Sequence, residues 1–380
     1  MSAWPLAPLA SVIQCRKEFV QIDDLSNYKR CRVQLHAQGI VLRDTVPGAE
    51  IKTKKQQVCK AGDFLVAEID AKVGGFGIVP EELDQAIVSS HYFLFEVNEK
   101  FLNRRFLDFF IRTPAFREQV AAQGSTNYAA IRPGDVLGYK LPLPPLPEQQ
   151  RIVTRIESLA PKIEEARGLR EEVQKDLSRL LNAAYHQIAD KAPRKPLGEL
   201  APLDRRPVTV DFEANYPQVA VRSFGRGTFH KPPLIGSEVT WEKPFLVKAG
   251  DILVSNIKAW EGAIAVAGAD DDGRVGSHRY LTCVAKPGIA TARFVCFHLL
   301  TSEGLYEVGE ASPGSADRNR TLSAKAFMQI PVPIPEYEKQ LWFDALYQKV
   351  NSIAKTQSES SPELAALLPS ILDKAFKGEL

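Results

Sequence analysis

The chain has 380 residues, of which 44% are hydrophobic and 25% charged, and its formal net charge is only +2. This composition is globular and long enough for two or more domains, and it excludes a disordered or fibrous chain. No stretch approaches the roughly 18 apolar residues needed to span a bilayer, so we predict no membrane-spanning segment. A near-neutral total does not decide for or against a nucleic-acid partner, because such a partner is recognised by a local patch of charge. We predict a soluble cytoplasmic protein with no membrane partner.

The two halves of the chain repeat each other. The segment KAGDFLV at residues 60–66 recurs as KAGDILV at residues 248–254. Further matches follow in the same order and end at two proline-rich runs, LPLPPLPE (141–148) and IPVPIPE (330–336). Chance does not produce so many ordered matches, so the chain is predicted to contain two homologous mixed α/β domains.

Within each half, the KAGD sequence indicates a loop that leads into a buried strand. Downstream in the first half, residues 105–120 carry phenylalanines at the spacing of a helix face. The proline-rich runs then end each domain, because proline fixes φ and excludes a continued helix or a central strand. The two domains are therefore predicted at residues 1–147 and 192–335.

A helical spacer is predicted between the two domains, at residues 148–191, and its long helix extends from Glu148 to Ala189. Its apolar residues recur in steps of three and four, which is the heptad spacing of a coiled coil. About 42 helical residues would be about 63 Å long, and Pro161 predicts a kink or a restart. The predicted apolar seam consists of Ile152, Ile156, Leu159, Ile163, Ala166, Leu169, Val173, Leu177, Leu180 and Ala184.

A second helical arm is predicted at residues 336–380, with a break into two helices at the SESSP sequence (358–362). Its apolar residues near the chain's end match those near the end of the first arm. Because a lone amphipathic helix would expose its apolar stripe, we expect the two arms to pack together. The predicted fold class is therefore α+β, with two mixed domains separated by two long helices in an antiparallel coiled coil.

No catalytic motif is present: the chain lacks a phosphate-binding GxxxxGK[ST] loop, a GxSxG elbow, an HExxH pair and the Asn-Pro-Pro-aromatic motif of adenine methyltransferases. Asp63 with Asp70 and Lys72 resembles the spaced carboxylates and lysine of metal-dependent nucleases. The second half lacks the corresponding second carboxylate, which argues against a nuclease site. The five scattered cysteines do not form a zinc motif. We predict no catalytic residue and no metal.

Basic and amide side chains gather in predicted loops. Residues 16–60 hold ten Lys/Arg against five Asp/Glu, which suits phosphate neutralisation, although lysines that protect a strand edge would explain the pattern equally well. Arginine with guanine and asparagine with adenine are favoured pairings in the major groove. The predicted DNA-binding residues are Lys52, Lys54, Lys55, Lys72, Thr126, Asn127 and Tyr128 in the first half, and Arg222, Arg226, His230, Lys231, Asn256, Lys258, Trp260, Arg318, Asn319 and Arg320 in the second.

The sequence resembles the specificity (S) subunits of type I restriction-modification systems. The resemblance rests on PLPPLPEQQRIVTRIE (142–157), KAGDILVSNIKAWEGAIAVA (248–267) and LLPSILDKAFKGEL (367–380), and with the duplication it covers essentially the whole chain. It implies two target-recognition domains, each reading one half of a bipartite asymmetric site in double-stranded DNA. It also implies that the helical arms fix the gap between the half-sites.

The same resemblance implies partner proteins. Two modification (methyltransferase) subunits would dock on the helical arms, and restriction (translocase-nuclease) subunits would join them. S-adenosylmethionine, ATP and Mg are then expected on these partners, and this chain is expected to be a non-catalytic subunit without a cofactor. The predicted partner-docking residues are Ile152, Ile156, Leu159, Ile163, Leu372 and Phe376.

Other interpretations of these residues stay open. The chain is alternatively a specificity subunit of a different methyltransferase-nuclease system. It is also alternatively a scaffold protein whose helical pair binds proteins and whose globular domains bind something other than DNA. An enzyme acting alone is a third class, and tight binding of S-adenosylmethionine by the isolated chain would favour it.

Overall fold

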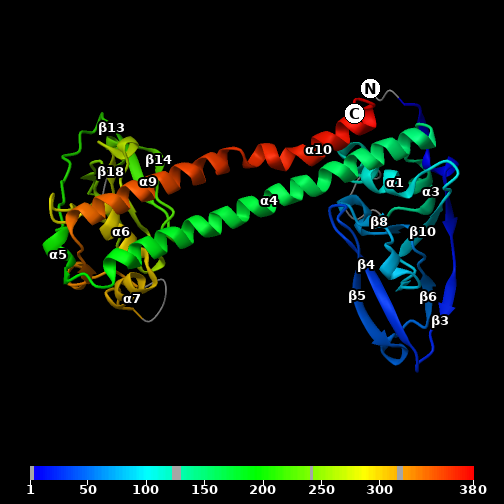
Figure 1. Ribbon diagram of the computed structural model, residues 1–380, viewed down its shortest axis with the longest axis horizontal. Helices are drawn as coiled ribbons and strands as arrows, with labels where there is room; N and C mark the ends of the chain where they lie inside the picture. The colour runs from blue at the N-terminus through cyan, green and yellow to red at the C-terminus, as the bar shows by residue number, and fades with distance from the viewer. Residues whose placement is uncertain (1–3, 122–129, 240–242, 315–319) are drawn as a thin grey trace. The chain divides into compact units, whose positions relative to one another are not determined.

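The computed structural model describes residues 4–121, 130–239, 243–314 and 320–380 (Figure 1). The chain forms two compact units: unit 1 comprises Met1–Arg170 and Ser358–Leu380, and unit 2 comprises Glu171–Gln357. Each unit contains one of the two sequence repeats. Because the division falls inside the long helix, the helical arms are shared between the two units.

Unit 1 is built from a larger mixed sheet, a smaller antiparallel sheet, a strand pair and short helices, among the residues described. The larger sheet has the order β3-β6-β9-β4-β5 and the smaller β2-β10-β7-β8, while β1 pairs with β11. The strands are β1 (Leu6–Pro8), β2 (Ile13–Arg16), β3 (Phe19–Gln21), β4 (Asn27–Gln34), β5 (Gly39–Pro47), β6 (Lys55–Val58), β7 (Phe64–Ala67), β8 (Phe76–Ile78), β9 (Ile87–Val88), β10 (Tyr92–Val97) and β11 (Lys140–Pro142). The helices are η1 (Leu9–Ser11), η2 (Gly48–Glu50), η3 (Asp70–Val73), η4 (Glu81–Leu83), α1 (Arg104–Phe110), α2 (Pro114–Ala121) and α3 (Pro133–Gly138).

Unit 2 repeats this arrangement. Its sheets have the orders β14-β13-β18-β15 and β17-β16-β19, and β12 pairs with β20. The strands are β12 (Arg194–Pro196), β13 (Asn215–Val221), β14 (Thr228–Ile235), β15 (Phe245–Leu246), β16 (Ile252–Ser255), β17 (Ile264–Val266), β18 (Val275–Gly276), β19 (Tyr280–Cys283) and β20 (Pro331–Pro333). The helices are α5 (Leu197–Leu200), η5 (Gly236–Glu238), η6 (Ala259–Glu261), η7 (Ala269–Asp271), α6 (Ala292–Leu300), α7 (Ser302–Glu310) and α8 (Ala324–Phe327).

The strand pairing of the two units agrees around the long hairpin, although each sheet of unit 2 has one strand fewer than its counterpart in unit 1 among the residues described. A long antiparallel hairpin, β4–β5 in unit 1 and β13–β14 in unit 2, carries a register shift in both cases. The first strand of each hairpin also pairs in parallel with a short strand, β9 or β18. The prediction of two homologous mixed domains is confirmed.

Three helices form the arms: α4 (Leu146–Ala189), α9 (Tyr337–Glu359) and α10 (Ser361–Lys377). In unit 1, Arg170 donates hydrogen bonds to the backbone carbonyl and the hydroxyl of Ser360. In unit 2, Gln174 bonds with Gln357 at 2.6 Å. A second contact joins Arg151 Nη2 to the carbonyl of Leu380 in unit 1, and the ring of Tyr185 to that of Phe343 in unit 2. In each unit α4 therefore runs antiparallel to its partner helix, as predicted, and the predicted break in the second arm falls between α9 and α10. No helix within the described ranges is both long and apolar enough to span a bilayer.

The arms differ from the prediction in two respects. Helix α4 passes through Pro161 without restarting, since losing one backbone hydrogen bond does not end a helix whose inner face is packed. The predicted seam holds only in part in its second half: Leu169 and Leu180 are 56% and 48% exposed and Leu181 is buried, whereas Ala184 is buried as predicted. An α-helix drifts by about 20° per heptad relative to a strict 3.5-residue repeat, so the inner face moves to neighbouring positions.

Each domain is fastened to its helices by the same contacts. The side chain of Gln149 at the start of α4 accepts a hydrogen bond from the N–H of Asn103, the residue that caps α1, and donates to two backbone carbonyls. Gln340 at the start of α9 binds the N–H of Thr291, the residue that caps α6, in the same way and also donates to two carbonyls. Both glutamines are fully buried.

Aromatic residues complete these junctions. Phe376 of α10 contacts Phe106 of α1 with ring centroids 4.9 Å apart, and Tyr185 of α4 contacts Phe294 of α6 at 5.4 Å. Each unit thus takes the beginning of one arm and the end of the other into its core. This confirms the sequence match between the ends of the two arms.

Candidate nucleic-acid interface

The repeated KAGD sequence forms the same ion pair in each unit. Asp63 pairs with Arg16 and accepts a 2.8 Å hydrogen bond from the N–H of Lys60. Asp251 pairs with Arg206 through two hydrogen bonds, of 2.6 and 3.2 Å. Both aspartates are buried, so the repeated carboxylate holds the turn in place. Within the described ranges no three His, Cys, Asp or Glu side chains form a metal-binding group.

The long hairpin of each unit ends in a loop of one backbone conformation. We call residues 35–38 tip 1 and residues 223–226 tip 2. In each tip the second and third residues have left-handed φ angles, of 61° and 57° in tip 1 and 62° and 63° in tip 2. This conformation costs a residue other than glycine about 1–2 kcal/mol, so the surrounding structure must hold it.

Both tips are held by the turn that follows the KAGD strand, η3 in unit 1 and η6 in unit 2. The second and third residues of each tip donate their backbone N–H groups to carbonyls of that turn. The bonds run from His36 to Val73 (2.7 Å), from Ala37 to Gly74 (2.9 Å), from Phe224 to Glu261 (2.8 Å) and from Gly225 to Gly262 (2.8 Å). Hairpin tip and turn therefore form one surface in each unit.

In unit 2 this surface brings together several predicted DNA-binding residues. Trp260 of η6 lies between two cations, with Lys258 Nζ 5.2 Å and Arg320 Cζ 4.9 Å from its rings. Arg320 also donates to the carbonyls of Gly309 and Ser312, and Lys258 forms a 2.6 Å ion pair with Glu261. The guanidinium is therefore fixed, as a base-reading side chain has to be.

Asn256 lies at the end of the KAGD strand of unit 2, beside this cluster. Its backbone bonds with Arg279 and Leu322. Its side-chain Oδ1 is buried and has no hydrogen-bond partner among the residues described. A buried acceptor without a partner is costly, which makes Asn256 a residue that gains from contact with a hydrogen-bond donor.

The basic residues of the β13–β14 hairpin divide into two groups. Arg222 and Arg226 lie at tip 2, where they stack on Phe229 (4.9 Å) and Phe224 (5.6 Å). His230 and Lys231 lie further along β14 and are exposed. His230 Nε2 bonds with Asp271 at 2.9 Å, so its ring is occupied within the unit. Lys231 remains on the strand surface.

In unit 1 the predicted lysines are not brought together. Lys72 lies in η3 beside tip 1 and is half-buried. Lys52, Lys54 and Lys55 lie toward the opposite end of the β4–β5 hairpin, where Lys54 forms an ion pair with Asp24 and Lys55 stacks on a phenylalanine ring. Lys52 is exposed. Of these, Lys72 has the same position relative to its tip as the cluster of unit 2.

Five predicted DNA-binding residues lie outside the described residues, so the structure does not place them: Thr126, Asn127, Tyr128, Arg318 and Asn319.

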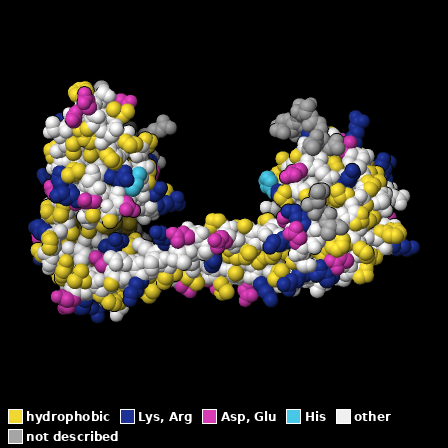
Figure 2. Space-filling view, turned by 90° about the horizontal axis from the view of Figure 1, so that it is seen from above, with side chains coloured by type: hydrophobic (Ala, Val, Ile, Leu, Met, Phe, Trp, Pro, Cys, Tyr) yellow, Lys and Arg dark blue, Asp and Glu magenta, His cyan; other side chains and the backbone are white. Residues whose placement is uncertain are grey.

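Sequence reasoning missed a basic cavity in unit 1. Arg30 and Arg32 of β4, Arg43 of β5 and Lys52 are among the residues that line a cavity of about 360 Å³, and Glu50 also faces it. The alternation of Arg30 and Arg32 along one strand was the available signal. Figure 2 shows that basic and acidic side chains are mixed on both units in that view, without a face of a single sign.

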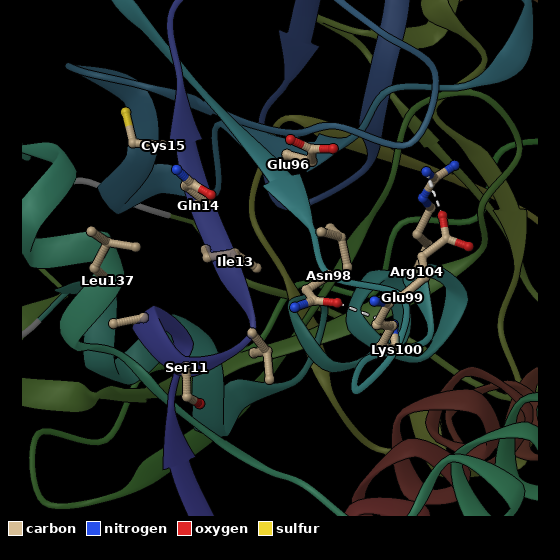
Figure 3. A pocket seen from close by; sticks show the side chains of 13 residues that line it. Ser11, Ile13, Gln14, Cys15, Glu96, Asn98, Glu99, Lys100, Arg104 and Leu137 are labelled. Carbon is tan, nitrogen blue, oxygen red and sulfur yellow. Dashed lines mark hydrogen bonds and ion pairs between the residues drawn. The ribbon is translucent and has the colours of Figure 1, made fainter.

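A second cavity of about 840 Å³ in unit 1 holds none of the predicted site residues (Figure 3). It is lined by strand β2 and by the segment after β10. Arg104 forms an ion pair with Glu99 there, and Asn98 accepts a hydrogen bond from the N–H of Lys100. The polar groups of this segment thus bind one another.

The predicted partner-docking residues require a correction. Ile152, Ile156, Ile163, Leu372 and Phe376 are buried, with 6% exposure or less, and all but Ile163 belong to the core of unit 1. Leu159 is half-buried. Side chains enclosed in this way cannot also contact another protein, so the apolar seam packs the chain against itself.

Comparison with known proteins agrees with this architecture. Residues 16–175 match the family of the type I restriction modification DNA specificity domain. A stretch of 189 residues, 47% of this chain, is 25% identical to the MjaVIII specificity subunit, a type I restriction enzyme subunit of Methanocaldococcus jannaschii. The match spans 44% of that relative's length.

Two solved structures have the same fold over nearly the whole chain. The HsdS subunit from Thermoanaerobacter tengcongensis is 24% identical, with a TM-score of 0.64, and the alignment covers 99% of this chain and 97% of that one. A chain from a structure of type I R-M complex assembly and conformational transition is 22% identical, with a TM-score of 0.71 and coverage of 99% and 98%. The chain is therefore similar to type I restriction-modification specificity proteins in two respects: residues 16–175 match the DNA specificity domain family, and the fold of the whole chain is the fold of these two solved structures.

Proposed function

We propose that this chain is the DNA sequence-specificity subunit of a type I restriction-modification complex and binds a bipartite, asymmetric site in double-stranded DNA. The observation that carries the proposal is the presence of two units with one backbone architecture and different exposed side chains. Such a pair has two surfaces with the same backbone shape and different side chains. Two different half-sites need the same shape to fit the DNA duplex, and they need different side chains because base contacts specify sequence.

The binding groups proposed for unit 2 are the cations around tip 2 and η6. Arg320, Lys258 and Arg222 supply charge for phosphates or guanine edges. In unit 1, the proposed DNA-binding groups are Lys72 and the arginines of β4 and β5 that line the cavity. In this proposal the chain itself has no catalytic role.

The proposed partners are two modification subunits, which bring S-adenosylmethionine, and restriction subunits, which bring ATP and Mg. They dock on the helical arms. Because the inner seam is buried, the docking faces are the outer ones, where Leu169 and Leu367 in unit 1 and Leu180 and Ile353 in unit 2 are 45–56% exposed. Exposed apolar side chains on a charged helix favour contact with another protein.

The test is co-expression of the chain with the modification subunit encoded beside it, followed by mapping of methylated adenines on host DNA by long-read sequencing. The control omits the chain. Methylation restricted to a two-part motif with a fixed gap, and absent from the control, is the expected result. Unchanged methylation without the chain, with both proteins soluble, would remove the specificity role.

Two further measurements separate the other functional classes. DNA binding that weakens steeply as salt rises favours phosphate contacts over a scaffold that binds no DNA. Tight binding of S-adenosylmethionine by the isolated chain would instead favour an enzyme that acts alone.

A further inference from the structure

We infer that the two hairpin tips read bases, through His36 and Gln38 in tip 1 and Phe224 and Arg226 in tip 2. This inference rests on the proposed function and names the specificity-determining residues within it. The observations are the shared conformation of the tips, the difference and exposure of their side chains, and the charge around tip 2.

The two tips have the same backbone frame and different side chains. The tips share their φ angles and their bonds to the following turn, yet they share no residue: tip 1 is LHAQ and tip 2 is SFGR. The second and fourth residues, His36 and Gln38 or Phe224 and Arg226, are exposed in both tips. A conserved frame that presents different exposed side chains is the arrangement that two half-sites require.

Phe224 is an unfavourable residue for its place in the turn. It is 71% exposed and has a φ of 62°, a conformation that glycine or asparagine adopts more easily. Its side chain thus adds strain to the turn and buries little apolar area in the free protein. Neither property helps the turn, but an exposed aromatic ring can contact the methyl group of thymine.

Positive charge gathers at tip 2. Tip 2 carries Arg226 and adjoins Arg222, and Ser223 Oγ bonds with Glu261 of η6 at 2.9 Å, which joins the tip to the Lys258–Trp260–Arg320 cluster. The opposite end of the unit 2 hairpin carries the carboxylates Asp211, Glu213 and Glu238 instead. A polyanion is therefore favoured at tip 2. In unit 1 the opposite end holds both carboxylates and lysines, so charge does not distinguish the two ends there.

The side chains fit base edges. Arg226 presents the donors that bind O6 and N7 of guanine, and Gln38 presents the amide that binds N6 and N7 of adenine. The two tips would thus select different bases. A good bidentate contact discriminates by about ten- to a hundredfold against the wrong base.

The test uses Phe224→Gly and Arg226→Ala in the full complex with the modification subunit, with methylated motifs mapped as above. Each variant is expected to relax one or more positions in one half-site, by about tenfold or more, and to leave the other half-site unchanged. Phe212→Gly is the matched control, because Phe212 is 70% exposed in the same unit but lies at the carboxylate-rich end of the hairpin.

The reciprocal variant replaces tip 1 by the residues of tip 2 (Leu35→Ser, His36→Phe, Ala37→Gly and Gln38→Arg). It is expected to change the half-site that the unit 2 variants leave intact. Thermal unfolding checks each protein, and Phe224→Gly should unfold at the same or a higher temperature, because glycine relieves the strained φ.

The outcomes separate the two proposals. A wild-type bipartite motif that survives every tip variant would overturn the role of the tips and leave the specificity role standing. In another outcome, a tip variant assembles with its partners and yet directs no methylation at all. This result supports the inference if the complex with Phe212→Gly still methylates the wild-type motif. It counts against the inference if Phe212→Gly also loses methylation. A wild-type chain that directs no bipartite methylation would remove both proposals.

Discussion

The guanidinium of Arg206 donates two hydrogen bonds to the carboxylate of Asp251, with 2.6 Å between Nη1 and Oδ2 and 3.2 Å between Nη2 and Oδ1. The aspartate side chain is only 4% exposed. The motif that most clearly marks the duplication is therefore a structural device, which ties the KAGD turn to the segment that precedes the hairpin.

The change Arg206→Met should lower the free energy of unfolding by about 3 kcal/mol, because it leaves a buried carboxylate without its cation. Urea denaturation measures the loss. Arg206→Met combined with Asp251→Leu should recover part of it, because no buried charge then remains. A single variant as stable as the wild-type protein would contradict the structural role.

The buried glutamines at the two helix starts allow a paired prediction. Gln340→Met and Gln149→Met should each destabilise the protein by about 3 kcal/mol, because each leaves one N–H and two carbonyls without a partner. Gln150→Met, a neighbouring change at an exposed position, should cost less than about 1 kcal/mol. If only one of the two buried glutamines matters in urea unfolding, the junctions are not equivalent in energy.

We expect the free energy of unfolding to depend on pH through His298. Burial lowers the pKa of this imidazole to about 4, while the unfolded chain has a pKa of about 6.5. The unfolded state therefore gains a proton between these values and the folded state does not, so the stability that is complete above pH 6.5 declines as pH falls toward 4. Unfolding at pH 7 and pH 5 should show a smaller difference for His298→Gln than for wild type.

The hydroxyl of Tyr185 lies 2.7 Å from Nδ1 of His298, so His298→Gln also removes a buried bond and lowers stability at both pH values. The pH dependence is the informative quantity. His91→Gln, at a side chain that is 69% exposed, is the control and should leave most of the dependence in place. An unchanged slope in His298→Gln would refute the assignment.

The cysteines should differ in reactivity. Burial raises the pKa of Cys283 and of Cys296 to about 12, whereas Cys15 is partly exposed. N-ethylmaleimide at pH 7.5 should therefore label Cys15 first and reach the other two only after denaturant is added, because the thiolate is the nucleophile. Peptide mass spectrometry shows the order in which the cysteines are labelled. Early labelling of Cys296 would show that the core around it unfolds locally in the native protein.

Much of the fold could be predicted because it depends on patterns of residues near in sequence. The duplication, the helical arms and the break near Ser360 all leave such patterns. The inner face of α4 beyond Leu169 could not be placed, because a heptad count assumes a supercoiled pair along the whole helix. The exposure of Leu180 and the burial of Leu181 show where that assumption ends.

The candidate interface was less predictable because it depends on contacts between distant residues. The ion pair of Lys54 with Asp24 joins residues 30 positions apart, and no local pattern announces it. The left-handed conformations of His36, Ala37 and Phe224 could not be predicted either, because residues other than glycine seldom adopt them. The tips are recognised as a shared element only when the φ angles and hydrogen bonds of the two units are compared.

The sharing of the arms has a consequence for biosynthesis. Unit 2 is continuous in sequence, whereas the core of unit 1 includes Leu372, Ala375 and Phe376 of α10. Because a chain emerges from the ribosome starting at its amino terminus, the domain that is synthesised first must wait for α10, with the rings of Phe106 and Phe110 uncovered until Phe376 arrives. The first domain made is thus the last to be completed, and its open aromatic patch is a natural target for a chaperone during translation.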